Sequence, residues 1–200
     1  DLIRNVFVFP HETQNSRVLV KVKPEQPLQN FTVCLRSYSD LSRPYSLFSY
    51  ATKAHDNEIL LFKPTPSEYR LYVGGKFVTF RVPASTVESE HVCAGWESAT
   101  GIVGFWLNGK PWPRKGLQKG YTVGAEASIV LGQGQEQDAF GDGFEVRQSF
   151  VGEISSVYMW DTGISTPQVQ AAMHDMPSQT PVFGWRNFPY EIVGDVYLKP

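Results

Sequence analysis

The stretch YRLYVGGKFVTFRV, residues 69–82, reads as two β-strands joined by a tight turn. Its two runs, YRLYV and KFVTFRV, are rich in the β-branched and aromatic residues that favour strands, and Gly74-Gly75 stands between them. The same rhythm recurs along the chain, in NVFVF, VLVKV, FTVCL, YSLFSY, EILLF, GIVGFWL, SIVL, VGEISSVYMW and EIVGDVYL. Many short strands separated by turns predict an all-β fold of two sheets, a β-sandwich or a jelly roll.

One stretch has a helical pattern instead, STPQVQAAMHDM at residues 165–176. Thr166 can cap a helix and Pro167 suits the first helical position. Apolar residues then recur at helical spacing, at Val169, Ala172, Met173 and Met176. We expect one short helix whose apolar face packs on the sandwich.

Length and composition fit a single domain over residues 1–200, with 42% hydrophobic residues to form a core. No apolar run approaches the roughly 18 residues needed to cross a bilayer, so we expect no membrane insertion. A net charge of −2 gives no broad attraction for nucleic acid. Asp1 leads almost directly into a strand-like run, which we interpret as the start of a mature, secreted chain.

Two cysteines and one glycosylation sequence agree with an extracellular location. Cys34 and Cys93 each lie in a β-like run, and no further cysteine completes a thiolate metal site. One disulfide is the simplest interpretation and would stabilise the fold by roughly 4 kcal/mol in the chain-entropy model. Two buried free thiols are the alternative. Asn30-Phe31-Thr32 is an N-glycosylation acceptor, which belongs to the same secretory route.

The segment GQGQEQDAFGDGFEVRQ, residues 132–148, holds four carboxylates and one basic side chain, Arg147. Carboxylate and amide oxygens without a nearby cysteine or histidine suit a hard cation, and calcium accepts the irregular geometry of a loop. A second oxygen-rich segment, HDNE at residues 55–58, supplies Asp56, Asn57 and Glu58. The two segments together predict one calcium site; two solvated acidic turns are the alternative.

A sandwich glycosidase is the enzymatic alternative, because Glu136-Gln137-Asp138 resembles the start of the catalytic strand of such enzymes. Retaining glycosidases need two carboxyl groups about 5 Å apart. Phe140 and Gly141 stand where the second glutamate would be. The sequence also lacks HExxH and GxSxG, and its histidines belong to no motif, namely His11, His55, His91 and His174. We therefore expect a binding protein with packed or exposed histidines.

The segment HVCAGWES, residues 91–98, resembles the pentraxin signature H-x-C-x-[ST]-W-x-[ST]. Together with LGQ…EQD at 131–138, QSFVGEI at 148–154 and YMWD at 158–161, the resemblance to the short pentraxins covers essentially the whole chain. Gly95 departs from the signature and removes a hydroxyl. A Gly-Gln pair precedes Glu136 where relatives run LGQEQD directly, which lengthens the loop and can shift a metal site.

The resemblance implies a flattened, lectin-like jelly roll of the concanavalin type, a cyclic homopentamer and two calcium ions per subunit. It also implies that Cys34 and Cys93 are the family's cysteine pair. The metal ligands carry over to Asp56, Asn57, Glu136, Gln137 through its main-chain oxygen, Asp138 and Gln148. Ligands that bind the exposed calcium would do so through phosphate or carboxylate oxygen.

Beside the metal, Phe62 and Tyr72 match the small apolar pocket of the family, and Phe77 stands where some members hold choline with a glutamate. Tyr72 narrows the pocket and Phe77 supplies no counter-charge, although an aromatic face attracts an ammonium by about 0.5–2 kcal/mol. We expect phosphoethanolamine or acidic saccharides to bind better than phosphocholine. A phosphocholine binder is the alternative within the family.

The resemblance further implies a serum protein of innate immunity, with complement and phagocyte receptors as partners. The basic stretch GKPWPRKGLQKG, residues 109–120, is expected to be a solvated loop; its alternative is a polyanion site. That site would use Lys110, Arg114, Lys115 and Lys119.

Overall fold

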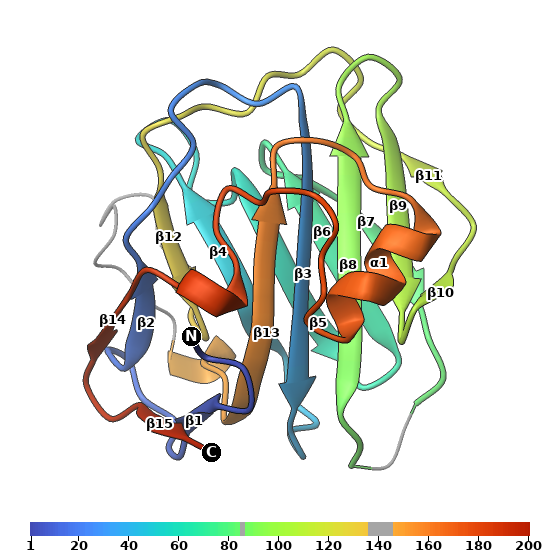
Figure 1. Cartoon of the computed structure of the whole chain (residues 1–200). Helices are drawn as coiled ribbons and strands as arrows, with labels where there is room; N and C mark the ends of the chain where they lie inside the picture. Colours follow the sequence, from blue (N-terminus) through green and yellow to red (C-terminus); the bar gives the residue numbers. More distant parts are fainter. Residues whose placement is uncertain (85–86, 136–145) are drawn as a thin grey trace.

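The computed structural model describes residues 1–84, 87–135 and 146–200 as two antiparallel sheets packed face to face (Figure 1). Along the first sheet the strands are β10 (Lys110–Pro111), β9 (Ile102–Leu107), β8 (Glu90–Glu97), β3 (Asn30–Tyr38), β13 (Gly152–Trp160), β1 (Val6–Phe9) and β15 (Tyr197–Lys199), and β11 (Lys115–Gly116) also pairs with β9. Along the second sheet they are β14 (Tyr190–Val193), β2 (Arg17–Val20), β12 (Ser128–Leu131), β4 (Tyr45–Ala51), β5 (Ile59–Thr65), β6 (Glu68–Val73) and β7 (Lys76–Arg81). The predicted all-β, two-sheet jelly roll is confirmed.

The hairpin of β6 and β7 forms where the sequence predicts it. Val73 pairs with Lys76, so Gly74-Gly75 is a two-residue turn, and both glycines have positive φ, +57° and +83°. Turns of this kind require left-handed backbone, which glycine adopts without steric cost. Alternation along β6 buries Tyr69, Leu71 and Val73 and turns the residues between them to the outer face.

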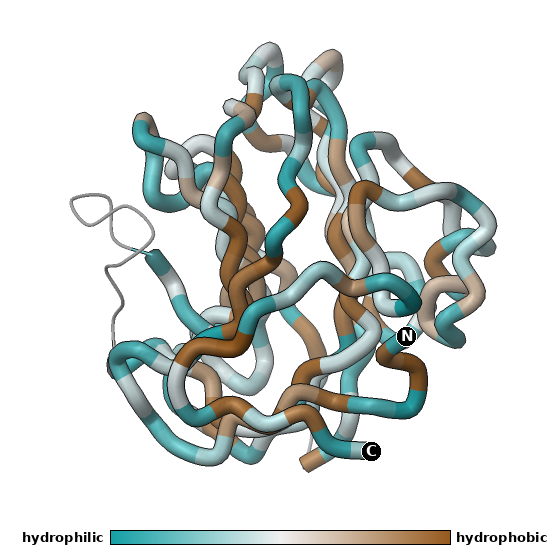
Figure 2. The backbone as a smooth tube through the Cα atoms, turned by 60° about the vertical axis from the view of Figure 1, so that its left-hand side comes forward, coloured by the Kyte–Doolittle hydropathy of each residue, from teal (hydrophilic) through white to brown (hydrophobic). Residues whose placement is uncertain are grey.

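The core lies between the sheets, where the hydrophobic stretches of the tube run (Figure 2). Phe80 of β7 stacks on Phe105 of β9 with ring centroids 4.6 Å apart, which joins the two sheets. Tyr69 packs against the same ring at 5.5 Å. Lys63 and Glu90 also meet in this interior, with Nζ and Oε1 2.7 Å apart, and Tyr69 donates to the same carboxylate oxygen at 2.5 Å. A buried ion pair therefore accompanies the aromatic packing.

Helix α1 (Thr166–Met173) covers the outer face of the first sheet (Figure 1). Ser165 is its N-cap, in a capping box with Gln168, so the prediction that Thr166 caps the helix was wrong by one residue. Val169 and Ala172 are buried as predicted. The helix ends before Met176, whose side chain is 66% exposed, so Met176 does not belong to the packed face. The described helices are too short to span a membrane.

The predicted disulfide is confirmed. Cys34 of β3 and Cys93 of β8 stand directly opposite each other in register and are bonded. Arg36, on the same face of β3 as Cys34, donates from Nη2 to the Met173 carbonyl oxygen at 3.1 Å. Since Met173 is the last residue of α1, the disulfide lies on the face of the first sheet that the helix covers.

The basic stretch at 109–120 is not wholly a loop. Its Lys110 and Lys115 begin the short strands β10 and β11, which both pair with β9. Lys115 Nζ also donates to the Thr79 carbonyl oxygen at 2.5 Å. Two short 3-10 turns, η2 (Val146–Gln148) and η3 (Trp185–Asn187), complete the described elements named here.

Candidate functional site

The loop that carries Asp56 and Asn57 joins β4 to β5 and lies against the turn between β6 and β7. The Asn57 carbonyl oxygen accepts a hydrogen bond from Gly75 N at 3.0 Å. Asp56 Oδ1 accepts another from Asn57 N at 2.9 Å, which fixes the local conformation. Both side chains are partly exposed. Two of the predicted ligands thus stand at the end of the second sheet, beside the hairpin.

Glu58, the third oxygen-bearing residue of this loop, has a structural role instead. Its side chain is 2% exposed, and its carboxylate accepts hydrogen bonds from the Tyr121 hydroxyl and, at 2.9 Å, from Gly124 N. Burial and then the interaction with Glu58 raise the pKa of Tyr121. The sequence prediction that Glu58 shares the oxygen cluster is corrected, because its carboxylate is held by these two donors.

The segment that leads into the acidic loop is pinned by two glutamines. Gln133 Nε2 donates to the carbonyl oxygens of Thr13 and Ser16, at 3.0 and 3.1 Å. Gln135 Nε2 donates to the Ser128 carbonyl oxygen at 2.9 Å and to Ser49 Oγ at 3.2 Å. The sequence prediction did not include Gln135 as a site residue. The additional Gly-Gln pair is the feature of the sequence that could have marked it. These hydrogen bonds therefore fix the residue immediately before residue 136 against β4 and β12.

Gln148, the last residue of η2, lies next to this pinned segment. Its Oε1 is 3.9 Å from the point that a Cβ on Gly134 would occupy. That point is also 2.9 Å from Ser46 Oγ, so residue 134 has little room for a side chain. The other predicted ligands, Glu136, Gln137 and Asp138, lie outside the described residues. Gln148 is thus placed at the base of the acidic loop.

The three predicted pocket aromatics come together on the outer face of the second sheet. The Phe62 and Tyr72 ring centroids are 6.4 Å apart, and those of Tyr72 and Phe77 are 5.0 Å apart. Phe62 is 6% exposed and Phe77 is 46% exposed. Because Phe77 follows the turn at Gly74-Gly75, the cluster lies at the same end of the sheet as the Asp56 loop.

Arg70 joins this cluster and was not predicted. Its guanidinium carbon lies 4.4 Å from the centroid of the Phe77 ring. Its Nη1 lies 3.4 Å from the Tyr72 hydroxyl, to which it donates. Residues 70 and 72 share one face of β6, so strand alternation is the signal that would have found it.

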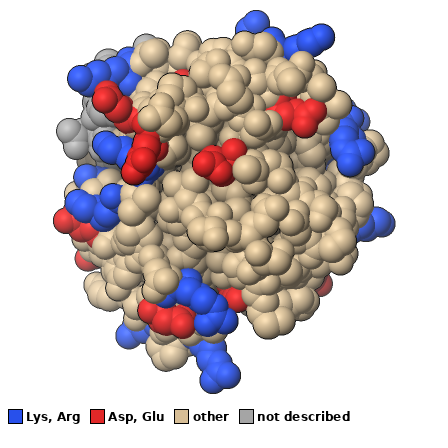
Figure 3. All heavy atoms as spheres, turned by 45° about the horizontal axis from the view of Figure 1, so that its top comes forward, with Lys and Arg blue, Asp and Glu red and all other residues tan. Residues whose placement is uncertain are grey.

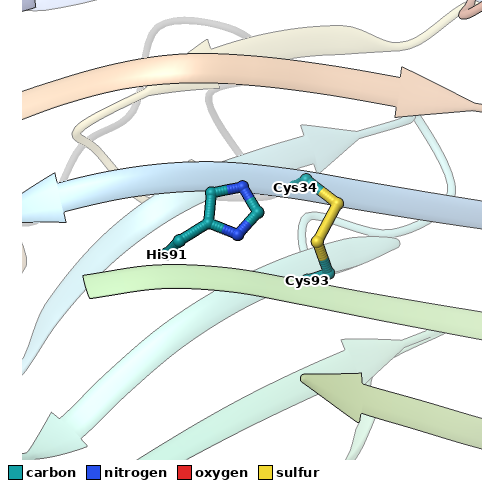
Figure 4. Close-up of side chains that lie close together, drawn as sticks. All are labelled: Cys34, His91 and Cys93. Atoms are coloured by element: carbon teal, nitrogen blue, oxygen red, sulfur yellow. A yellow bond between two sulfur atoms is a disulfide. The ribbon is translucent and has the colours of Figure 1, made fainter. Parts of the chain in front are cut away.

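Cys34, His91 and Cys93 also lie close together, on the first sheet (Figure 4). The two sulfurs are bonded to each other, so they are not available as thiolate ligands. His91 is fully buried, and burial, then Arg36 and His174, lower its pKa to about 3. This agrees with the expectation that the histidine is a packed residue.

Charged side chains do not gather into one patch on the face drawn in Figure 3, where both signs lie around a broad uncharged area. In the basic stretch, Lys110 Nζ lies 6.0 Å from the Trp112 ring centroid and Lys115 is engaged with β7. Arg114 and Lys119 are exposed. Most of this basic stretch is solvent-exposed surface.

A two-sheet jelly roll that carries the partly exposed Asp56 loop beside an aromatic cluster has an arrangement typical of ligand-binding proteins. The chain belongs to the Pentaxin family, which it matches over residues 5–200. It is 50% identical over 200 residues to serum amyloid P-component of Cavia porcellus, covering all of this chain and 89% of that protein. It is also 50% identical over 202 residues to human C-reactive protein, with the same coverage of each chain.

A heptameric pentraxin from Limulus polyphemus, described as similar to serum amyloid P, has a similar fold. The TM-score is 0.82 over 97% of this chain and 94% of that chain, at 22% identity. Segments such as LQNFT, YSDLSR and YSLFSY resemble serum amyloid P component, which we favour as the nearer type, whereas DNEIL and GYTVGAEASI resemble C-reactive protein. The predicted family is confirmed. Pentraxins are recognition proteins without enzymatic activity, and the chain is assigned to that class.

Proposed function

We propose that this pentraxin is a calcium-dependent pattern-recognition protein whose ligands bind on the outer face of the second sheet. One observation supports it most: the Asp56 loop and the aromatic cluster of Phe62, Tyr72 and Phe77 lie at the same end of that sheet. A metal beside an apolar pocket can hold an anionic group and select its substituent.

Two calcium ions would be held by oxygen donors alone. Asp56 and Asn57 offer partly exposed oxygens, Gln148 lies at the base of the acidic loop, and Glu136, Gln137 and Asp138 follow the pinned Gln135 in sequence. Hard oxygen donors in irregular loops fit calcium. Bound calcium would supply positive charge and a coordination position for phosphate or carboxylate oxygen.

The pocket favours ligands with a small substituent. Tyr72 stands between Phe62 and Phe77, within 6.4 Å of each ring by centroid distance, and narrows the space beside the metal. Phosphoethanolamine and acidic saccharides are the expected ligands, with phosphocholine weaker. Equal or tighter phosphocholine binding in calorimetry would support the alternative, a phosphocholine binder.

The wider role follows from the family. Secretion into serum, a homopentameric ring, and presentation of ligands to complement and phagocyte receptors are part of the proposal, as is a glycan on Asn30, which is partly exposed at the start of β3. Several weak sites on one ring meet ligands on a surface at high effective concentration. Light scattering gives the subunit number, and mass spectrometry before and after glycosidase treatment gives the occupancy of Asn30.

The direct test is retention on phosphoethanolamine resin, with calcium and then with chelator, beside an Asp138→Asn variant. Retention that requires calcium, ends on chelation and is lost in the variant is expected. Retention without calcium, or unchanged retention of the variant, would contradict the proposal.

Polyanion binding is a second candidate, supported by the exposed Arg114 and Lys119. Binding to heparin without calcium should weaken steeply as salt rises, because counterion release drives it. A flat response to salt would refute this candidate.

A further inference from the structure

We propose that Arg70 sets the ranking of ligands at this site: phosphate or carboxylate ligands that carry no positive charge bind more tightly than ligands with an ammonium group, phosphoethanolamine included. The inference rests on the proposed function, since it concerns the same aromatic pocket. It goes further by assigning selectivity to a side chain that the family resemblance does not mark.

The position of Arg70 is fixed by the pairing of three strands. Phe62 of β5 stands opposite Arg70 of β6, and Tyr72 stands opposite Phe77 of β7. All four side chains therefore share the outer face of the second sheet, in two adjacent rows. Arg70 is thus part of the aromatic cluster and not a distant surface charge.

The guanidinium of Arg70 covers one face of Phe77. A distance of 4.4 Å from Cζ to the ring centroid is a cation–π contact. A ligand ammonium would need an aromatic face or a carboxylate in this place. Arg70 already occupies this face of Phe77, and its charge has the same sign as that of the ammonium.

The charge of Arg70 is not balanced by an ion pair in the described part of the chain, where no carboxylate oxygen lies within 4.0 Å of its nitrogens. Its Nε is buried and has no hydrogen-bond partner there. Glu68, two residues earlier on the same face, accepts a hydrogen bond from Thr65 at 3.2 Å. The guanidinium therefore presents a net positive charge to the pocket.

A second cation at the pocket changes the ranking of ligands. It attracts the anionic part of any ligand and repels an ammonium held nearby, and each effect at a partly exposed site is worth about fivefold in affinity. Three probes separate these effects because they share one phosphate monoester: ethyl phosphate, phosphoethanolamine and phosphocholine. Only the last two carry a positive charge.

The test is calorimetric titration of the full chain with these probes, with and without calcium, for the wild type and three variants. Arg70→Gln removes the charge, Arg70→Lys keeps it, and Arg81→Gln removes a charge from the same face of β7, two rows beyond Phe77. Thermal unfolding of each variant shows that it folds.

Wild type should bind ethyl phosphate at least about fivefold tighter than phosphoethanolamine or phosphocholine. Arg70→Gln should reduce that ratio by about fivefold, because the attraction for the shared phosphate cancels and only the repulsion of the ammonium is lost, while Arg70→Lys and Arg81→Gln stay close to wild type. Calcium-dependent binding of all probes with the same ratio in wild type and Arg70→Gln would overturn the inference alone. No calcium-dependent binding of any probe by wild type would overturn the proposed function, and the inference with it.

Discussion

Glu58 Oε2 accepts a hydrogen bond from Gly124 N at 2.9 Å, and this contact ties the loop that carries Asp56 and Asn57 to a segment more than sixty residues away. The second carboxylate oxygen, Oε1, accepts from the Tyr121 hydroxyl. A buried carboxylate thus holds the loop in place, while the side chains of Asp56 and Asn57 remain partly exposed.

Replacing Glu58 with Gln should lower both stability and calcium affinity. The amide nitrogen would face at least one donor, so the free energy of unfolding should fall by about 1–3 kcal/mol. Urea unfolding and calcium titration measure the two effects. Tyr121→Phe should reproduce part of the loss, and a double variant whose loss equals the sum of the two would contradict a shared network.

Replacing Gln135 with Ala should weaken calcium binding more than it weakens the fold. The change removes the hydrogen bonds that pin residue 135 to Ser128 and Ser49, each worth about 1 kcal/mol. Equilibrium dialysis and thermal unfolding measure binding and stability. Gln170→Ala, which removes a bond to Gly109 near α1, is the matched control and should leave calcium affinity unchanged. Equal calcium affinity in both variants would show that the anchor does not matter.

Replacing Lys63 with Met should cost about 3–5 kcal/mol of unfolding free energy, because the change removes the cation that faces the buried Glu90. Adding Glu90→Gln to this variant should recover a large part of the loss. Denaturant unfolding of the single and double variants tests this. A double variant no more stable than Lys63→Met would argue against the ion pair as the cause.

The free energy of unfolding should fall in mild acid because His91 is protonated more readily in the unfolded chain. Its pKa is about 3 in the folded chain and 6.5 when unfolded, so between these values the unfolded chain binds more protons. The contribution is therefore fully present above pH 6.5 and is lost as pH falls toward 3, by at most about 1.4 kcal/mol per unit. Unfolding measured at pH 7 and pH 5, with His91→Gln beside wild type, should show a smaller loss in the variant. Identical losses in the two proteins would show that His91 does not cause the pH dependence.

Strand alternation and turn residues were sufficient to predict the two sheets, the hairpin at Gly74-Gly75 and the single helix. They missed β10 and β11, because two-residue strands carry no periodicity and depend on pairing with β9. The N-cap of the helix is Ser165 and not Thr166 as predicted, since Gln168, three residues after Ser165, completes the capping box.

For the site, residue chemistry marked Asp56, Asn57 and the aromatic cluster but did not reveal which side chains support them. Glu58 looks like a further ligand in sequence, and only its contact with Gly124 shows it to be a buried support. Arg70 could have been found from strand alternation along β6, whereas Gln135 acts through a side-chain hydrogen bond to Ser49, a residue distant in sequence that local patterns do not specify.

The central claim is that two separate acidic segments bind calcium together. Equilibrium dialysis of wild type, Asp56→Asn and Asp138→Asn against calcium tests it most directly, with Asp161→Asn, an exposed residue after β13, as the control. We predict two ions per chain in wild type and in the control, as the family resemblance implies, and weaker binding in both of the other variants. No bound calcium in wild type, or full binding in Asp56→Asn, would contradict the account.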